Sequence, residues 1–536
     1  MSAALFKNGI FPFASKNNPS NSVPSNSIYV ENGIIKAIGP ASELELQLSG
    51  QAYSTIDWEG AYVLPGLVDA HMHLGMYGMK LSMLDFTGVK SKAEMLALIK
   101  ERAAVTPAGE WITGLNWNEN EFSPAAAPTR QELDEVTDRH PVFLTRTCFH
   151  AFLGNTEAFR RAGIPDGAPD PDSGAFGRHA DGSFNGWIYE EACYPFEQAQ
   201  PEPDYETKKD VVRRAMLSAL SLGLTGAHTE DLRFLGSVDT MLRIHRELRE
   251  EGIAFRTHQL MFHAYMKEAA GLGVMAGSGD EWTRIGAMKI FADGAIGGRT
   301  ALLQQPYSDA PHTRGMAIQT EEQLHELVAM ARRHGYPIAV HAIGDGAAAL
   351  TLGAMEKHPL GPSSGLPDRF IHAQVLDRNL VERMSRLPLI ADIQPRFVAS
   401  DFPWVLERVG PDRQDYLYAW KKLLQAGIVC AGGSDAPIEP LDPFLGIHAA
   451  VTRRRPGQTG EGYLPEECLS MQEAVHLFTL GSAAVVAEEK QRGSIEAGKS
   501  ADFTVIDRNI TDDPESLLGV NVKMSVVNGQ IGYSAL

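Results

Sequence analysis

The sequence predicts an α/β protein built on a TIM-type (β/α)₈ barrel, with a β-sandwich made from both chain ends and an α+β subdomain inserted after the first barrel strand. Three observations support this prediction. Eight short apolar runs lie along the middle of the chain, helical stretches separate several of them, and potential metal ligands follow their ends. Strands that alternate with helices form parallel sheets, and eight repeats form a barrel whose chemistry lies at the carboxyl ends of the strands.

Both chain ends resemble short strands joined by tight turns. Asn32-Gly33 separates two strand-like runs near the N-terminus, and Asn528-Gly529 interrupts another near the C-terminus. An Asn-Gly pair between β-rich runs is a hairpin signal. We therefore expect residues 1–60 and 490–536 to form one composite β-sandwich.

The barrel is expected over residues 61–75 and 206–489. Its first strand is the apolar run Val63–Leu74, which contains His71 and His73. The other strand candidates are residues 224–229, 253–262, 285–291, 336–341, 369–372, 389–394 and 428–434. Capping boxes at Thr320–Gln323 and Ser470–Glu473 predict the starts of two helices.

Residues 76–205 interrupt the barrel between its first and second strands, where a connection is normally much shorter. This insert begins a helix with the capping box Ser91–Glu94 and holds Trp111, Trp117 and Trp187. Because it grows from the top of the first strand, we expect it to roof the active site. Each tryptophan can equally belong to the insert's own core.

Composition narrows the class of partner. A formal charge of −19 over 536 residues argues against nucleic acid or an anionic membrane, so the expected partner is a small molecule. The cysteines, Cys148, Cys193, Cys430 and Cys468, are too scattered for a disulfide framework or a CxxC site.

No apolar run approaches the roughly 20 residues that span a bilayer, and no Sec signal is evident, so we expect a cytoplasmic protein. The sequence leaves open whether the chain forms a homodimer.

His71 and His73 are the first candidate metal ligands. Alternate side chains of a strand point to the same side, so both imidazoles can face one ion. Neutral imidazole suits zinc and its neighbours. Alone, the pair is equally explained by two hydrogen-bonded histidines near a strand end.

Further candidates end other predicted strands. His341 and His372 end the fifth and sixth strands, Asp435 follows the eighth, and Lys289 lies near the end of the fourth. Each has an ordinary structural explanation when taken singly, such as a helix cap for Asp435. Together, at one rim of one barrel, they predict a site for one or two divalent ions, with zinc preferred.

Lys289 cannot bind a metal ion as an ammonium, because an ammonium has no lone pair and is repelled by cations. Its amine can react with carbon dioxide, and the resulting carbamate has two oxygens that can bridge two metal ions. The alternative is an unmodified Lys289 that pairs with Asp293 or binds a substrate carboxylate, with only one tightly held metal.

These residues lie within motifs that resemble the amidohydrolase superfamily, and within it the YtcJ-like, amidohydrolase-3 branch that contains N-substituted formamide deformylases. The motifs are residues 65–73, 289–300, 340–345, 433–437 and 493–502, with a further similar segment at 146–159 in the insert. Two positions depart from the branch. Phe149 stands where a glycine is usual before His150, and Ile371 replaces the usual glutamate before His372, which affects a carboxylate that would orient a ligand.

The resemblance implies that His71, His73, Lys289 and Asp435 hold the more buried metal, while carboxylated Lys289, His341 and His372 hold the other. A metal lowers the pKa of bound water from 15.7 to roughly 7, which supplies hydroxide at neutral pH. Asp435 then acts as general acid and base. Asp69 and Asp345 are candidates for orienting the ligands. Trp117, His150, Arg299, His228 and His263 are weaker candidates for contacting the substrate.

The leading hypothesis is therefore a metal-dependent hydrolase of a C–N bond in a small N-acyl or N-formyl compound. A deaminase or a lactone or ester hydrolase is the alternative among enzymes, since the same hydroxide can attack those groups. A catalytically silent assembly protein is the alternative outside enzymes. Such proteins usually lose metal ligands, whereas all six positions are filled here.

Overall fold

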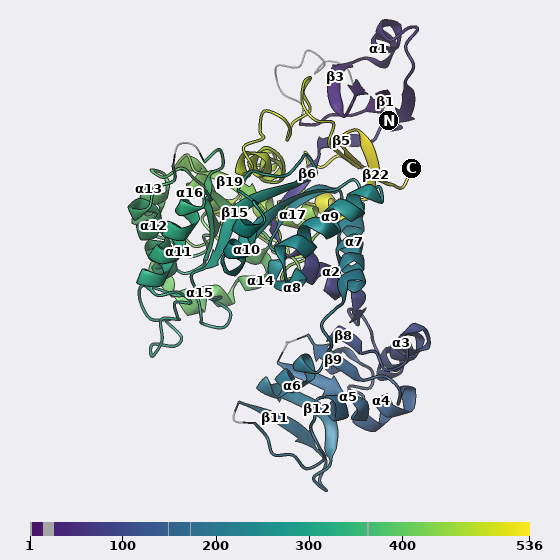
Figure 1. The fold of residues 1–536 in the computed structure, drawn as a ribbon, viewed down its shortest axis with the longest axis vertical. Coiled ribbons are helices and arrows are strands. Elements are labelled where there is room, and N and C mark those ends of the chain that lie inside the picture. The colour runs from purple at the N-terminus through teal and green to yellow at the C-terminus, as the bar shows by residue number, and fades with distance from the viewer. Residues whose placement is uncertain (1–2, 14–25, 148–149, 172, 362–363) are drawn as a thin grey trace. The chain divides into compact units, whose positions relative to one another are not determined.

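The computed structural model describes residues 3–13, 26–147, 150–171, 173–361 and 364–536 (Figure 1). Cys148 and Phe149, on which two of the sequence interpretations depend, lie outside these residues. The chain divides into two compact units, residues 1–77 with 212–536 and residues 78–211. Each unit has its own sheets and its own core.

The larger unit contains an eight-stranded parallel sheet whose strands neighbour one another in chain order. They are β6 (Leu67–Met72), β13 (Leu224–Thr229), β14 (Arg256–Phe262), β15 (Thr283–Phe291), β16 (Ile338–Ala342), β17 (Asp368–His372), β18 (Leu389–Ile393) and β19 (Val429–Gly432). Just beyond β19 the chain bonds to the first strand. The Asp435 N–H donates to the His71 carbonyl at 2.7 Å, and the His73 N–H donates to the Ala436 carbonyl at 2.8 Å. The predicted (β/α)₈ class is confirmed.

Helices follow most of these strands. They include α8 (Leu232–Leu235), α9 (Val238–Glu250), α10 (Met266–Gly271), α11 (Glu321–Arg333), α12 (Asp345–Lys357), α13 (Arg378–Met384), α14 (Phe397–Asp401), α15 (Trp404–Val409), α16 (Trp420–Gln425), α17 (Pro443–Thr452), α18 (Met471–His476) and α19 (Ser482–Val485). The predicted capping boxes at Thr320 and Ser470 are present at the starts of α11 and α18. Helix α11 buries Leu324, Val328 and Ala331, which lie on one face at helical spacing.

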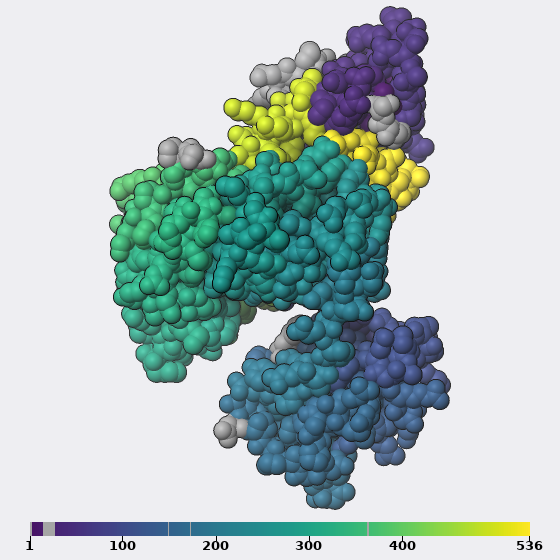
Figure 2. Space-filling view, in the orientation of Figure 1, coloured from purple at the N-terminus to yellow at the C-terminus, as the bar shows by residue number. Residues whose placement is uncertain are grey.

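Strands from both chain ends form two further sheets of four strands in the same unit. One has the order β3 (Ile34–Gly39), β2 (Asn26–Glu31), β1 (Ala3–Gly9), β4 (Ser54–Asp57). The other has the order β22 (Gln530–Ser534), β21 (Val522–Val527), β20 (Phe503–Ile506), β5 (Tyr62–Pro65). Phe6, Trp58 and Phe503 belong to one buried cluster that joins the two sheets. In Figure 2 the purple N-terminal segment accordingly lies against the yellow C-terminal segment.

The smaller unit has a six-stranded mixed sheet with helices on both faces. Its order is β11 (Gly174–Arg178), β12 (Phe184–Glu190), β10 (Ala151–Gly154), β9 (Val142–Arg146), β8 (Ile112–Trp117), β7 (Leu84–Asp85). Its helices are α3 (Lys92–Val105), α4 (Arg130–Val136), α5 (Thr156–Arg161) and α6 (Tyr194–Gln198). Along β9, Val142 and Leu144 pack with α3 and α4, while Phe143 packs with α5 and α6. This is the alternation that a strand covered on both faces requires.

Trp117 belongs to the core of the smaller unit. Its side chain is fully buried, packs within 5.2 Å of the Trp187 ring, and donates from Nε1 to the Leu144 carbonyl at 3.2 Å. Trp117 therefore packs within the core of this unit, and its contact with substrate stays a prediction.

Across the part of the chain that the structure describes, none of the helices combines the length and apolarity that a bilayer crossing requires.

Candidate active site

The six predicted ligand residues all lie at the carboxyl-terminal rim of the barrel. His71, Lys289, His341 and His372 stand at or near the ends of β6, β15, β16 and β17, while His73 and Asp435 directly follow β6 and β19. Parallel strands bring their carboxyl ends to one edge, which is why residues so distant in sequence meet. All are buried except His341, whose side chain is 14% exposed.

Three of these residues present donor atoms to a common point. Nε2 of His71 lies 3.5 Å and Nε2 of His73 lies 3.4 Å from Oδ1 of Asp435. All three donor atoms fall within 4.8 Å of one another. Ligand atoms at about 2.0–2.1 Å from a tetrahedral zinc ion are roughly 3.3 Å apart, so the donor set fits such an ion.

Hydrogen bonds fix the orientation of three of the imidazoles. Nδ1 of His73 bonds to the Glu230 carbonyl at 3.0 Å, and Nε2 of His341 bonds to the Gly294 carbonyl at 3.0 Å. Nδ1 of His372 bonds to Oε1 of Gln394 at 2.8 Å. A ring nitrogen that donates to an oxygen leaves the other nitrogen with its lone pair, as metal ligation requires.

His341 and His372 form the second half of the site. Their ring centroids are 4.4 Å apart, and the ring of His372 is 5.6 Å from that of His71. The His71 and His73 rings are 5.5 Å apart. Four imidazoles therefore form one contiguous group around Asp435 and Lys289.

Burial keeps most of these imidazoles neutral. Burial, reinforced by the charge of Lys289, lowers the pKa of His71 well below its usual value, and burial does the same for His341. Burial lowers the pKa of His372 to about 4. For His73, burial opposes the charged form, but the hydrogen bond and charge of Asp435 outweigh it and raise the pKa. Neutral imidazoles are the form that binds a metal.

Lys289 is fully buried among these candidate ligands. Its Nζ lies 3.1 Å from Nε2 of His71 and 4.9 Å from the centre of the Phe291 ring. Burial lowers its pKa to about 7, and the opposing charges of Asp435 and Glu230 restore only part of the loss. Asp293, its alternative partner, instead accepts backbone N–H groups of the following loops, and within the described residues no Lys289–Asp293 bond is present.

The two carboxylates predicted to orient ligands have different roles. Oδ1 of Asp69 accepts the His71 N–H at 2.9 Å, and both Asp69 oxygens accept the Ser434 N–H, which ties the backbones that carry His71 and Asp435. Asp345 accepts the Gln304 N–H at 2.8 Å. Its role in orienting a ligand stays a prediction. Oδ1 of Asp293 lies 3.6 Å from Nε2 of His341, which is close enough for an ionic contact but not for a hydrogen bond.

The structure separates the remaining substrate candidates. His228 is buried inside the barrel with its ring centroid 5.1 Å from that of His258, which is also its register partner on β14. Its contact with substrate stays a prediction. Arg299 is partly exposed on the loop after β15 and pairs with Asp309 at 2.6 Å. His150 pairs with Glu190 at 2.9 Å in the smaller unit. The roles of Arg299, His150 and His263 stay predictions, as does the roof that the insert is expected to form.

Sequence reasoning missed a buried ion pair beneath the ligands. Nε of Arg369 donates to Oδ2 of Asp392 at 2.7 Å, with side chains 1% and 0% exposed, and Nη2 donates to the Ala70 carbonyl at 2.6 Å. Asp392 is the cross-strand partner of Ile371, where the resemblance leads one to expect a glutamate. Ile371 itself packs into an apolar cluster. The available signal was an aspartate in the middle of the apolar run Leu389–Ile393.

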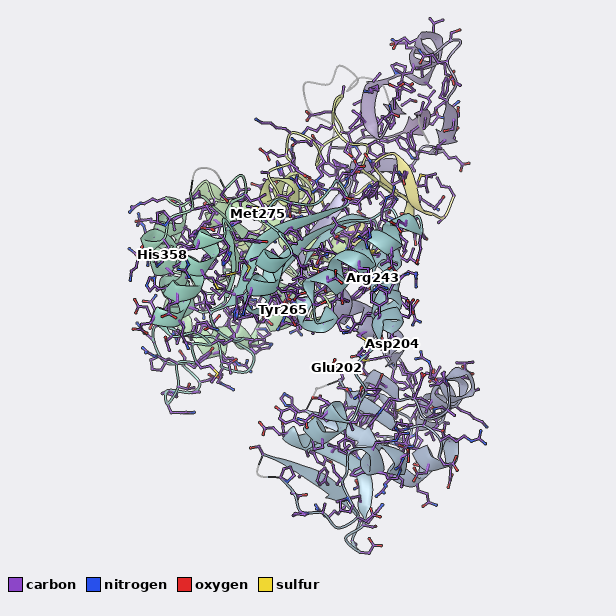
Figure 3. All side chains as sticks on the ribbon, viewed as in Figure 1. Glu202, Asp204, Arg243, Tyr265, Met275 and His358 are labelled. Carbon is purple, nitrogen blue, oxygen red and sulfur yellow. The ribbon has the colours of Figure 1, made fainter. Side chains whose placement is uncertain are left out.

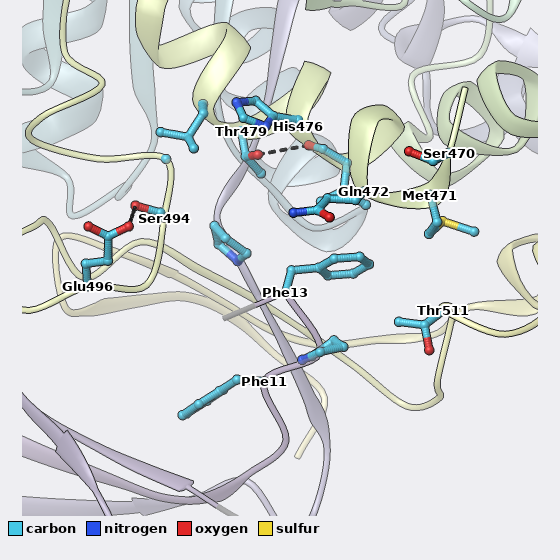
Figure 4. A pocket seen from close by; sticks show the side chains of 15 residues that line it. Phe11, Phe13, Ser470, Met471, Gln472, His476, Thr479, Ser494, Glu496 and Thr511 are labelled. Atoms are coloured by element: carbon cyan, nitrogen blue, oxygen red, sulfur yellow. Dashed lines mark hydrogen bonds between the residues drawn. The ribbon is translucent and has the colours of Figure 1, made fainter. Parts of the chain in front are cut away.

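A cavity of about 970 Å³ lies at the other end of the barrel (Figure 4). Its lining includes Phe11, Phe13, His476 and Thr479, and it reaches Pro65. Pro65 precedes β6, whose opposite end carries His71. The cavity is therefore separate from the candidate active site.

Known proteins are similar over nearly the whole chain. Residues 54–533 match the sequence profile of the amidohydrolase family. The protein YtcJ of Bacillus subtilis strain 168 is 42% identical over 510 residues, which cover 95% of this chain and 96% of the relative. An N-substituted formamide deformylase of Arthrobacter pascens is 26% identical over 529 residues, covering 95% of this chain and 94% of the relative. The crystal structure of an uncharacterised metal-dependent hydrolase from Pyrococcus horikoshii superposes with a TM-score of 0.76 at 28% identity, covering 96% and 99% of the two chains.

Proposed function

Because the chain belongs to the amidohydrolase family, we propose that it hydrolyses an amide-type C–N bond in a small N-acyl or N-formyl compound. The observation that carries this proposal is the buried group of His71, His73 and Asp435, in which two imidazole rings and one carboxylate converge on one point. A relative named for deformylation of N-substituted formamides favours a small acyl group. Metal-dependent hydrolysis as such follows from the family and from the metal-dependent hydrolase among solved structures.

The proposed metal is zinc, since the donors are imidazoles and a carboxylate rather than oxygens alone. His71, His73, Lys289 and Asp435 would hold the more buried ion, and His341 and His372 would hold a second. When bound, the metal supplies Lewis acidity that activates water and polarises the scissile carbonyl.

Asp435 is the proposed proton-transfer residue. Burial alone would raise its pKa, but the hydrogen bond with His73 and the surrounding positive charges lower it. The carboxylate is therefore ionised at neutral pH and accepts the proton that the attacking water loses. Protonated Asp435 then donates this proton to the departing nitrogen, so that the C–N bond breaks and a neutral amine leaves.

A product analysis tests the proposed reaction. Zinc-loaded protein is incubated with N-formyl and N-acetyl amines, and formate or acetate, amine and ammonia are quantified. We expect carboxylate and amine in a one-to-one ratio, with at least a hundredfold loss of rate after chelation and recovery on adding zinc. Ammonia as the nitrogen product, or turnover of matched esters alone, would assign the site to the alternative hydrolases instead.

We also propose that Lys289 is carboxylated. Its Nζ is buried beside His71 and has no carboxylate in hydrogen-bond contact among the described residues, so an ammonium there is poorly compensated. A pKa of about 7 leaves a large neutral fraction. The neutral nitrogen attacks carbon dioxide, an N–C bond forms, and a proton is released, which gives a carbamate anion suited to a cationic site.

Labelled bicarbonate tests the modification directly. Protein equilibrated with ¹³C-bicarbonate should show one slowly exchanging carbamate carbon resonance that the Lys289→Met variant lacks. Lys421→Met is the matched control, because Lys421 pairs with Glu473 on the outside of the barrel. Identical spectra for wild type and Lys289→Met would contradict the proposal.

A further inference from the structure

An arginine stands one aromatic ring away from the metal ligands. Arg233 lies on α8, immediately after β13. Its guanidinium carbon is 4.5 Å from the centre of the Phe291 ring and 5.7 Å from that of Phe262. The same Phe291 ring lies 4.9 Å from Nζ of Lys289 and 5.3 Å from the His341 ring. Phe291 therefore contacts both Arg233 and the candidate ligands Lys289 and His341.

The guanidinium is held in a defined orientation. Its Nε donates to Oε2 of Glu230 at 2.7 Å, and the Arg233 backbone N–H faces Oε1 at 3.3 Å. Glu230 is fully buried, and its own carbonyl orients His73. With Nε tied to a buried carboxylate and one face against aromatic rings, the guanidinium loses little further freedom on binding a ligand.

The remaining edge of Arg233 is available to a ligand. The side chain is 43% exposed, and Nη1 and Nη2 have no hydrogen-bond partner among the residues that the structure describes. Two parallel N–H donors of this kind match a carboxylate in a bidentate pair.

Two other arginines at the rim are already occupied. Arg299 uses Nε and Nη2 on Asp309. Arg408 donates to the carbonyls of Ile296 and Gly297, with its guanidinium over the Trp404 ring. Arg233 thus differs from both in having an oriented and unused donor edge.

We infer that Arg233 binds a carboxylate of the substrate, so that the substrate is an amide whose nitrogen substituent carries an acidic group, as in an N-acyl amino acid. This inference rests on the proposed function. The surroundings of Arg233 also fit an aromatic or apolar side chain on the same substrate. Phe262 and Phe291 are half-buried. His263 and Tyr265 lie in the short turn that follows β14, and Tyr265 is labelled in Figure 3.

Two substrates that differ only in the carboxylate test this role. N-formylphenylalanine is compared with N-formyl-2-phenylethylamine, and the ratio of their kcat/KM values is measured for wild type, Arg233→Lys and Arg233→Met. In Arg233→Met this ratio should decrease by about 10-fold to 100-fold, mainly because the KM for the acidic substrate rises. Arg233→Lys should retain part of the preference, since it keeps the charge but not the fork.

Because Arg233→Met leaves Glu230 without its cation, the double variant Arg233→Met/Glu230→Gln removes both charges and serves as the second test. Arg378→Met is the control, because Arg378 is an exposed arginine paired with Glu382 on α13, and it should keep the wild-type ratio. An unchanged ratio in Arg233→Met and in the double variant overturns the inference while leaving amide hydrolysis intact.

A binding measurement separates this inference from the proposed reaction. The affinity of the zinc-loaded protein for 3-phenylpropionate is measured by calorimetry in the same variants. If the wild type hydrolyses neither formyl compound, the proposed reaction fails. Even then, a tenfold or greater loss of 3-phenylpropionate affinity in Arg233→Met supports the carboxylate site. Equal affinity in wild type and Arg233→Met overturns it.

Discussion

Replacing Asp435 with asparagine should lower kcat by at least about a thousandfold while the barrel stays folded. The substitution removes the anionic oxygen that lies 3.4 Å from His73 and 3.5 Å from His71, and with it the group that accepts and returns the proton. Asparagine also suits the backbone. Asp435 has a φ of +59°, a left-handed conformation that asparagine tolerates far better than alanine does.

The measurement is kcat for Asp435→Asn at saturating substrate, together with the zinc content and the Tm of the variant. Asp512→Asn is a matched control, since Asp512 is exposed and accepts hydrogen bonds from its neighbours Asn509 and Thr511 in a surface turn. It should keep wild-type activity. A kcat of Asp435→Asn within tenfold of wild type, with zinc bound, would rule out Asp435 as the proton-transfer residue.

Replacing Arg369 with methionine should lower the free energy of unfolding of the barrel by about 3–5 kcal/mol. The methionine fills a similar volume but leaves the Asp392 carboxylate, 0% exposed, without its cation. An uncompensated buried charge is more harmful than the absence of the pair. The Ala70 carbonyl also loses its side-chain donor, one residue before His71.

The double variant Arg369→Met/Asp392→Leu separates these two effects. It removes both charges, so it should recover most of the loss, while the loss of the Arg369 donor to the Ala70 carbonyl keeps it about 1–3 kcal/mol below wild type. Urea unfolding followed by far-UV circular dichroism measures both changes. Arg378→Met, at an arginine 81% exposed, should stay within about 0.5 kcal/mol of wild type. If Arg369→Met behaves like this control, the buried pair has no structural role.

Sequence patterns located the candidate ligands because each of them depends on one local rule. An apolar strand fixes where its own end lies, and parallel strands bring all their carboxyl ends together, so His71, His341 and His372 could be assigned without knowing the loops. Period-two alternation placed His73 on the same side as His71. The meeting of these residues at Asp435 then follows from barrel closure.

The positions of Asp293 and Asp392 around the candidate ligands escaped prediction because they depend on geometry between strands and on loops, whereas Asp69 was predicted from its place on the same strand as His71. Asp293 and Asp345 both follow strand ends that carry ligands, and only the path of the intervening chain decides which of them approaches His341. Asp392 lies opposite Ile371 through the register of β17 and β18, which one strand alone does not reveal. His228 has the right residue type on a barrel strand, but its side chain is enclosed in the barrel interior against His258.

The junction between β5 and β6 has a consequence for the order of folding. Only Gly66 separates β5, which pairs with β20, from β6, which leads to His71 and His73. A Cβ atom at Gly66 would approach Thr225 and Asp502 within 2.7 and 2.9 Å, so this crossing is tightly enclosed. During synthesis, β6 emerges early but lacks its closing bonds to the chain just after β19 until that segment has left the ribosome, and β5 lacks its partner β20 for longer still. Closure of the barrel and completion of the ligand group are therefore late events, governed by contacts between distant parts of the chain.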